Sequence, residues 1–215
     1  FLFIPGTIGS ITWLARNEAR LGRVIAGLTA VNLGDPGMIH YKRSRRGDAL
    51  IDRAAAHVLR GRKHRILDFS PYGYDERQFC SPGINLPVGC LSRTPYGQFP
   101  QYHTSADDLD LVRPEALEDS LAVFRAIFDI LERDRSYLNL SPKGEPQLGR
   151  RGLYAAIGGR SDTRDFQMAL PWVLNQSDGA ASLLDIAERA GLPFPLIAEA
   201  AETLAAHGLL AETAR

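Results

Sequence analysis

The chain has 215 residues, of which 45% are apolar and 23% charged, a globular composition that excludes wholesale disorder. Its 25 Lys and Arg side chains balance 25 Asp and Glu side chains, so net charge favours neither a nucleic-acid partner nor a membrane surface. No apolar run reaches the roughly 18 residues that a transmembrane helix needs. Two cysteines are too few for a disulfide scaffold, and the first residues show no signal-peptide pattern. We therefore expect a cytoplasmic protein with two free thiols.

The first third of the sequence predicts strands that alternate with helices. The apolar run Phe1–Pro5 predicts a central strand, and a helix is expected to begin at Ile11–Asn17. A second strand is expected over Gly27–Leu33, because Gly34-Asp35-Pro36-Gly37 is a strong turn signal. A buried strand at the first residue needs neighbours on both sides. We therefore expect this chain to be the C-terminal part of a longer protein.

The alternation continues through the middle of the chain. Asp48–Arg60 predicts an amphipathic helix, and Arg65–Phe69 and Val88–Leu91 predict short strands. Arg113–Arg133 predicts a long helix with apolar side chains at helical spacing. This order is typical of an α/β domain with a mainly parallel sheet flanked by helices, which we place at residues 1–140.

The last third has a different character. Residues 141–149 (SPKGEPQLG) have the composition of a linker, and residues 150–215 predict a small winged helix-turn-helix module. Within it Ser182 and Asp185 fit a capping box at the start of a helix over Ser182–Ala190. The second helix, Leu196–His207, contains no Lys or Arg. Because contact with phosphates needs positive charge, we expect a structural or protein-docking module rather than a nucleic-acid reader.

Charge is unevenly distributed along the neutral chain. Residues 1–66 carry 12 basic and 4 acidic side chains, whereas residues 67–149 carry 7 and 13. The basic cluster Lys42–Arg46 has two interpretations. It holds a phosphate or an acidic sugar, or it is either a solvated turn or a partner for the acidic middle region.

The segment Tyr72–Asp110 is the richest in functional groups. It is long, rich in Gly and Pro, and a loop of about 30 residues in a compact domain is usually functional. Within it His103 precedes Asp107 by four residues, which suits a zinc ligand whose second ring nitrogen is held by a carboxylate, although a surface histidine is the alternative. The adjacent Asp75, Glu76 and Arg77 suit either contacts to a substrate's amine and carboxylate or a salt bridge that fixes the loop.

Several of these motifs resemble those of a known enzyme family. Tyr102-His103-Thr104-x-x-Asp107 is similar to the last zinc-ligand motif of the two-zinc aminopeptidase-like family (peptidase clan MH). YDERQFCSPG, VNLGDPG and FLFIPGTIGSITWL resemble three further family segments. Within the family, the chain looks like a bacterial subfamily with a C-terminal winged helix, whose members are often named polysaccharide biosynthesis proteins with an aminopeptidase-like domain.

The resemblance implies roles for individual residues. His103 and Asp35 match zinc ligands, Asp107 would orient His103, and Asp75, Glu76 and Arg77 would contact substrate. Gly6 and Thr7 stand where the family has two glutamates, a general base and a metal ligand, and neither residue can do those jobs. Glu18 or Glu76 would have to replace the base. The other family ligands lie upstream, so at most two are present, too few for a zinc site of three or four protein ligands.

Two functions follow as expectations. The first is a zinc-dependent aminopeptidase-like hydrolase that acts on a small peptide or aminoacyl amide bond, of which this chain alone is inactive. The second is a catalytically degenerate peptidase fold that binds a ligand or protein partner, with the winged helix as the docking module. Hydrolysis of aminoacyl substrates by the chain alone would contradict the first, and a third possibility, a DNA-binding regulator, conflicts with the acidic second helix.

Overall fold

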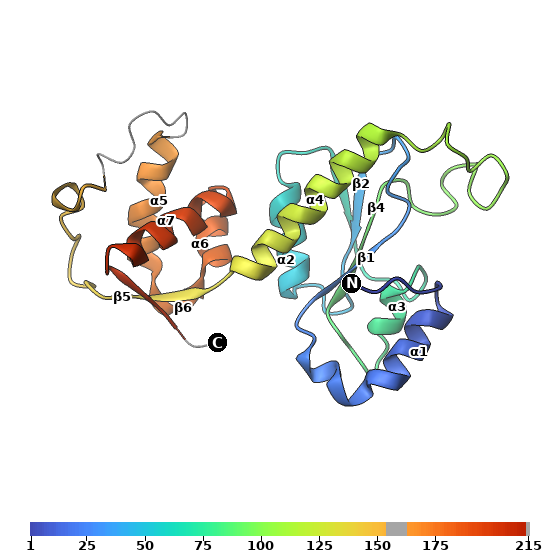
Figure 1. Cartoon of the computed structure of the whole chain (residues 1–215), viewed down its shortest axis with the longest axis horizontal. Helices are drawn as coiled ribbons and strands as arrows, with labels where there is room; N and C mark the ends of the chain where they lie inside the picture. The colour runs from blue at the N-terminus through green and yellow to red at the C-terminus, as the bar shows by residue number, and fades with distance from the viewer. Residues whose placement is uncertain (154–162, 214–215) are drawn as a thin grey trace. The chain divides into compact units, whose positions relative to one another are not determined.

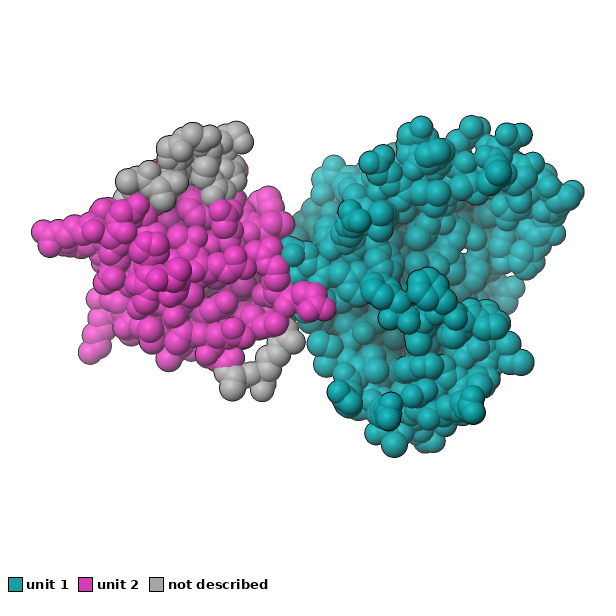
Figure 2. Space-filling view, in the orientation of Figure 1, with its two compact units in different colours: residues 1–131 teal, residues 132–215 magenta. Residues whose placement is uncertain are grey.

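The computed structural model describes residues 1–153 and 163–213 (Figure 1). The chain forms two compact units, residues 1–131 and residues 132–215 (Figure 2). In the part of the chain that is described, no helix is long and apolar enough to cross a bilayer.

The first unit is built on a four-stranded sheet in the order β1-β4-β2-β3. Its strands are β1 (Gly27–Ala30), β2 (Ile39–Lys42), β3 (His64–Leu67) and β4 (Val88–Ser92). β1 is parallel to β4 and β2 is parallel to β3, but β2 and β4 are antiparallel. The sheet is therefore mixed. The strand β2 was not predicted, because its four residues follow a turn and run into the basic cluster.

Helices cover the two faces of this sheet. In Figure 1, α2 (Leu50–Leu59) and α4 (Pro114–Arg133) lie on one side, and α1 (Ile8–Asn17) and α3 (Glu76–Phe79) on the other. A 3-10 helix, η1 (Glu18–Arg23), follows α1. The core beneath α1 and α3 is apolar and includes Leu14, Leu21, Cys80, Leu86 and Val88. The predicted helices α1, α2 and α4 are thus confirmed, with ends that shift by a few residues.

A buried polar group connects α2 to the sheet. Tyr41 is fully buried in β2 and its hydroxyl donates to Asp52 Oδ1 at 2.8 Å. The Asp52 carboxylate also accepts the Ser44 N–H at 2.7 Å, the Ser44 hydroxyl at 2.6 Å and the Ala49 N–H at 3.1 Å. Gly89 in the neighbouring strand β4 leaves the space for the tyrosine, because a Cβ there would overlap the Tyr41 ring. Four hydrogen bonds therefore satisfy this buried carboxylate.

The prediction of a strand at Phe1–Pro5 is wrong for this chain. The segment has no strand hydrogen bonds, and Phe1 and Phe3 are almost completely exposed. An apolar run becomes a strand only where a neighbouring strand pairs with it, and no described residue does so here.

In its described residues, the second unit combines a three-stranded antiparallel sheet with three α-helices. The sheet runs β6-β5-β7, from β5 (Ser136–Asn139), β6 (Asp178–Ser182) and β7 (Leu210–Glu212). The helices are α5 (Thr163–Gln176), α6 (Leu183–Ala190) and α7 (Phe194–Ala206), and a short 3-10 helix, η2 (Gly149–Arg151), precedes them.

This unit begins earlier in the chain than the predicted module at 150–215. β5 pairs with both β6 and β7, so residues before the expected 141–149 linker belong to the second sheet, and the linker itself lies inside the unit. The strand β5 is short and is followed by a Pro- and Gly-rich stretch. The local sequence therefore does not indicate to which of the two units it belongs. Residues 154–162 and 214–215 of the expected module lie outside the described part of the chain.

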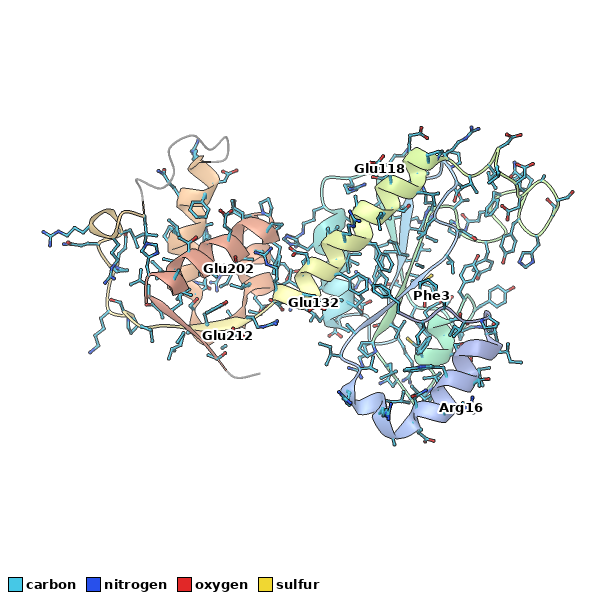
Figure 3. The ribbon with its side chains drawn as sticks, in the orientation of Figure 1. Phe3, Arg16, Glu118, Glu132, Glu202 and Glu212 are labelled. Carbon is cyan, nitrogen blue, oxygen red and sulfur yellow. The ribbon has the colours of Figure 1, made fainter. Side chains whose placement is uncertain are left out.

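The predicted helix-turn-helix elements are confirmed. Ser182 Oγ accepts the Asp185 N–H at 3.2 Å and Asp185 Oδ2 accepts the Ser182 N–H at 2.8 Å, which completes the capping box. Glu202 of α7, labelled in Figure 3, pairs with Arg133 at 2.9 Å. Most other residues of α7 are buried, including Ile197, Ala200, Ala201 and Leu204. The helix therefore stabilises the unit and presents little surface of its own.

Candidate functional site

A buried ion pair organises the loop that follows β3. Glu76, the first residue of α3, is fully buried and its Oε1 lies 2.5 Å from Lys42 Nζ, at the end of β2. The Tyr74 N–H donates to the same oxygen at 3.2 Å. Lys42 Nζ also donates to the carbonyls of Ser70 at 3.2 Å and Tyr72 at 2.9 Å. One lysine thus holds three points of the loop on the sheet.

Two buried polar atoms of this loop have no hydrogen-bond partner in the described part of the chain. Glu76 Oε2 and Arg77 Nε are both buried, and neither makes a hydrogen bond with the residues described. Buried polar atoms in native proteins are almost always paired, and each exception calls for an explanation such as a water, an ion or a ligand. The pair therefore marks a place where the protein leaves binding capacity for a group it does not itself supply.

Asp75 lies against a strained turn before α1. Its Oδ1 accepts the Thr7 N–H at 2.5 Å and the Ser10 hydroxyl at 2.9 Å. Thr7 has a φ of 61° and the Ile8 N–H donates to the Gly6 carbonyl at 2.7 Å, which is a classic γ-turn, a rare and strained conformation. Strained residues of this kind cluster at functional sites.

The γ-turn lies at the positions where the resembled family has two glutamates. The nearby carboxylates are therefore the candidates to replace them. No carboxylate projects from Gly6 or Thr7, but that of Asp75 is held against their backbone. Glu18, the proposed substitute, begins η1 at the opposite end of α1 and is exposed. Of the two candidates, only Glu76 shares the loop with Asp75.

A series of aromatic rings extends from this loop to His103. The Tyr74 hydroxyl accepts the Asn32 amide at 2.6 Å, and its ring contacts that of Tyr96 with centroids 5.3 Å apart. Tyr96 in turn contacts Tyr102 at 6.3 Å, and Tyr102 stacks on His103 at 4.0 Å. Burial, with the neighbouring Tyr102, raises the pKa of Tyr74, so its hydroxyl remains protonated at neutral pH.

His103 and Asp107, the two proposed site residues of the motif at 102–107, lie at the surface. His103 has a φ of 59° and is exposed, as is Asp107, whose N–H donates to the Thr104 carbonyl at 3.2 Å. No hydrogen bond joins His103 to Asp107 in the described structure. Their proposed roles as zinc ligand and orienting residue therefore remain proposals.

Asp35, the other proposed zinc ligand, is buried within its own turn. It accepts the Gly37 N–H at 2.8 Å, the Thr94 hydroxyl, and the Thr94 N–H at 3.1 Å. A Cβ on Gly37 would overlap Thr94 and the Asp35 carboxylate. The carboxylate therefore joins the loop after β1 to the loop after β4.

Zinc does not fit the residues of this chain as a complete site. Among the described residues, no three His, Cys, Asp or Glu side chains lie close enough together to hold a metal ion. His103 and Asp35 would supply two ligands, and a zinc site needs three or four from protein. A complete zinc site would therefore need ligands from outside the described residues.

Sequence reasoning did not assign Lys42 to the site, and it predicted Cys90 only as a free thiol. Lys42 stood in the basic cluster, and the alternative interpretation, a partner for the acidic middle region, is the one that its contact with Glu76 confirms. Cys90 is free and buried in β4, and burial together with the Glu76 carboxylate raises its pKa. The thiol is therefore protonated at neutral pH and is no nucleophile.

Comparison with known proteins gives relatives for both units. Residues 1–134 match the family described as "Domain of unknown function (DUF4910)", and residues 135–212 match a winged helix-turn-helix family. A Clostridium acetobutylicum protein is 52% identical over 206 residues, which are 95% of this chain and 47% of that protein. Its provisional name is polysaccharide biosynthesis protein with aminopeptidase-like domain.

The solved structure of a relative agrees with this relationship. The crystal structure of a protein from Clostridium acetobutylicum, provisionally described as a peptidase, superposes with a TM-score of 0.89 and 48% identity, over 99% of this chain and 48% of that one. An aminopeptidase from Aneurinibacillus sp. strain AM-1 matches at a TM-score of 0.48 and 18% identity, over 57% of this chain and 30% of that one.

The chain thus spans about half the length of the relatives it matches. The predicted resemblance to aminopeptidase-like proteins with a winged helix is confirmed. The chain belongs to the family described as a domain of unknown function (DUF4910), here followed by a winged helix-turn-helix domain.

Proposed function

We propose that this chain supplies the substrate-binding part of an aminopeptidase-like hydrolase, which cleaves an amide bond at the amino terminus of a small peptide or in an aminoacyl conjugate. The observation that carries the proposal is the buried Glu76 carboxylate, of which one oxygen is paired with Lys42 and the other has no partner in the described chain. A substrate ammonium group is the type of donor that this oxygen lacks.

The neighbouring charges have complementary roles. Asp75 and Glu76 bind the amino group of the substrate, and Arg77 binds a carboxylate or carbonyl through its unpartnered Nε. The γ-turn at Thr7 fixes the position of Asp75. Tyr74 beside them supplies a protonated hydroxyl that orients a polar group of the substrate.

The proposed zinc donors of this chain are His103 and Asp35, with Asp107 to orient His103. Because two donors are too few, a complete site needs ligands from outside these 215 residues. This requirement agrees with the expectation that the chain alone is inactive.

The test is hydrolysis of aminoacyl amides by the full-length gene product. We expect Glu76→Gln to raise KM about tenfold with a smaller change in kcat, because the substitution removes a charge that binds the ground state as well as the transition state. The matched control is Glu202→Gln, the same exchange on an exposed side chain of α7. An unchanged KM in a folded Glu76→Gln protein would contradict the proposed role.

Metal content is measured on the same protein. We expect zinc to bind and His103→Ala to reduce the zinc bound per chain, whereas His207→Ala, an exposed histidine of the second unit, leaves it unchanged. A full-length product that binds no zinc would refute the metal proposal without affecting that for Glu76.

A second candidate function follows from the absence of glutamates at Gly6 and Thr7. If no carboxylate replaces the two family glutamates, the chain is a binding protein on a peptidase fold, and the second unit docks a protein partner. The full-length product would then bind dipeptides with a measurable heat but would not hydrolyse them.

A further inference from the structure

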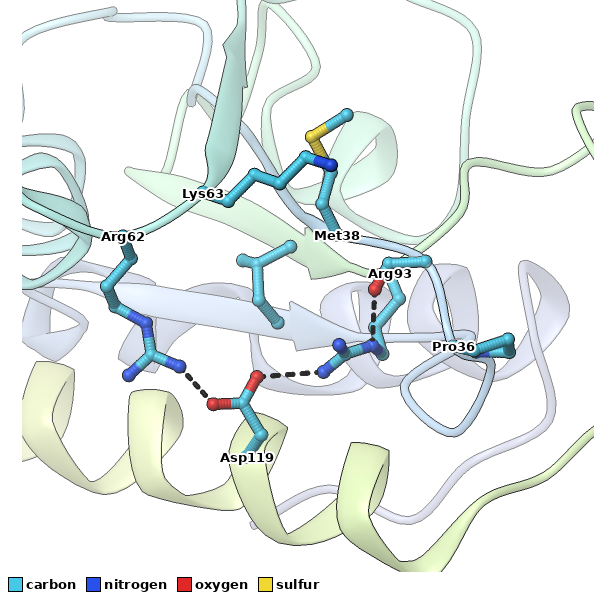
Figure 4. A pocket seen from close by; sticks show the side chains of 8 residues that line it. Pro36, Met38, Arg62, Lys63, Arg93 and Asp119 are labelled. Atoms are coloured by element: carbon cyan, nitrogen blue, oxygen red, sulfur yellow. Dashed lines mark hydrogen bonds and ion pairs between the residues drawn. The ribbon is translucent and has the colours of Figure 1, made fainter.

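A cationic pocket lies beside α4, apart from the groups discussed above. It has a volume of about 460 Å³ and opens between the turn after β1 and the start of β3 (Figure 4). Its lining consists of a short apolar wall and four charged side chains, namely Pro36, Gly37, Met38, Ile39, Arg62, Lys63, Arg93 and Asp119.

Positive charge in this pocket exceeds negative charge. Three cationic side chains line it against the single carboxylate of Asp119, which leaves a net charge of +2. Asp119 accepts hydrogen bonds from both Arg62 and Arg93, the latter at 3.0 Å. The Lys63 ammonium makes no ion pair or hydrogen bond with the residues described.

The arginines are held in place before any ligand arrives. Arg93 is only 11% exposed, and its Nε donates to the Gly37 carbonyl at 2.8 Å while Nη1 donates to the Ala116 carbonyl at 3.2 Å. Arg62 uses one guanidinium nitrogen for Asp119. Figure 4 shows both guanidinium groups approaching Asp119 from opposite sides. Such preorganisation lowers the entropy cost of binding an anion.

We propose that this pocket binds the phosphoryl group of a small organic phosphate. A phosphate dianion matches the excess charge of +2, and guanidinium groups recognise its oxygens through directed hydrogen bonds. The wall of Pro36, Met38 and Ile39 provides apolar contact for the organic part. The volume is in the range of pockets that hold whole small molecules, which is larger than an isolated phosphate needs.

This binding site is independent of the proposed hydrolase function. The pocket shares the turn of Pro36 and Gly37 with the Asp35 carboxylate, but none of Asp75, Glu76 or Arg77 lines it. A protein without hydrolase activity would therefore still bind phosphate.

The experiment is calorimetric titration with inorganic phosphate and with phenyl phosphate at constant ionic strength, against a matched chloride titration. We expect saturable binding of both probes, tighter for phenyl phosphate because of the apolar wall. Loss of one charge-assisted hydrogen bond in Lys63→Met should weaken binding by about tenfold. The matched control, Lys143→Met, removes the same charge from an exposed site in the other unit and should leave affinity unchanged.

Two results would overturn the proposal. One is a phosphate titration that matches chloride, and the other is equal phosphate affinity in the Lys63→Met and Lys143→Met proteins. Arg62→Gln provides a second variant at a partly exposed position, where we also expect weaker binding. Circular dichroism of each variant confirms that the fold is intact.

Discussion

The Asp35 turn and the Glu76 loop each contain a buried carboxylate, but the protein treats the two groups differently. The oxygens of Asp35 accept hydrogen bonds from Gly37 and Thr94, so the turn satisfies its own charge. One oxygen of Glu76 is paired with Lys42 and the other has no partner in the described chain. Burial alone therefore does not identify a group that binds a ligand. A buried polar atom without a hydrogen-bond partner is the better indicator.

The largest expected effect on stability tests the ion pair between Lys42 and the buried Glu76. Lys42→Met leaves Glu76 as an uncompensated buried charge, which should lower the free energy of unfolding by about 3–5 kcal/mol. The double variant Lys42→Met/Glu76→Leu should recover most of that loss, because no buried charge remains. Urea denaturation in a Trp172→Phe background, followed by Trp13 fluorescence, reports on the first unit alone.

Arg43→Met is the control for that measurement. Arg43 follows Lys42 but lies 4.0 Å from Asp68 in an exposed pair, so its loss should cost less than about 1 kcal/mol. Equal losses for the Lys42 and Arg43 variants would show that the Lys42–Glu76 pair is no more important than a surface contact.

The next largest effect tests the Asp35 side. Asp35→Ala leaves the N–H groups of Gly37 and Thr94 without their acceptor, and we expect a loss of about 2–4 kcal/mol in stability. Asp35→Asn keeps one acceptor oxygen and should lose about half as much. Stability is measured by urea denaturation, and an Asp35→Ala protein as stable as the wild type would show that the turn does not depend on this carboxylate.

A smaller effect concerns the backbone that positions Asp75. Thr7 sits at φ 61°, which glycine adopts without steric cost, so Thr7→Gly should raise stability by about 1 kcal/mol. If the strain serves substrate binding, the same variant should raise the KM of the full-length hydrolase. Thermal unfolding gives the first quantity, and a lower midpoint would contradict the assignment of strain.

The smallest effect concerns Asp119, a carboxylate near the surface that serves as a reference for the two buried ones. Burial opposes ionisation of Asp119, but its bonds to Arg93 and Arg62 prevail and lower its pKa below the ordinary value of 3.8. The folded state therefore binds this proton less readily than the unfolded state, and the stabilisation present above pH 4 is lost as the pH falls toward the lowered pKa.

Asp119→Asn should consequently cost about 0.5 kcal/mol at pH 7 and less at pH 3. Urea denaturation at the two pH values measures the difference. A cost that grows as the pH falls would show that the arginines do not favour the ionised form of Asp119.

Most of the secondary structure could be predicted, because periodic apolar positions and caps are local signals. The capping box of Ser182 and Asp185 and the long helix α4 are examples. The strand β2 and the membership of β5 depend on partners distant in sequence, which no local pattern records. Phe1–Pro5 has the composition of a strand, but pairing requires a neighbour.

For the same reason, the sequence alone indicates only the region of the candidate site, and the roles of its residues remain proposals. Residue types indicated a functional loop over Tyr72–Asp110, and the unpartnered atoms of Glu76 and Arg77 lie in that segment. Lys42 lies 34 positions earlier in the sequence, so only tertiary structure reveals that it neutralises Glu76. The pocket of Arg62, Lys63 and Arg93 combines residues from two loops and has no motif.

The space beneath Tyr41 limits how the family can vary. A side chain larger than hydrogen at position 89 would overlap the tyrosine ring, and a tyrosine at 41 requires an acceptor such as Asp52. These three positions are distant in sequence but should change together in evolution. Among homologues, we expect a larger residue at 89 to occur only with a smaller one at 41, and only then a residue other than aspartate at 52.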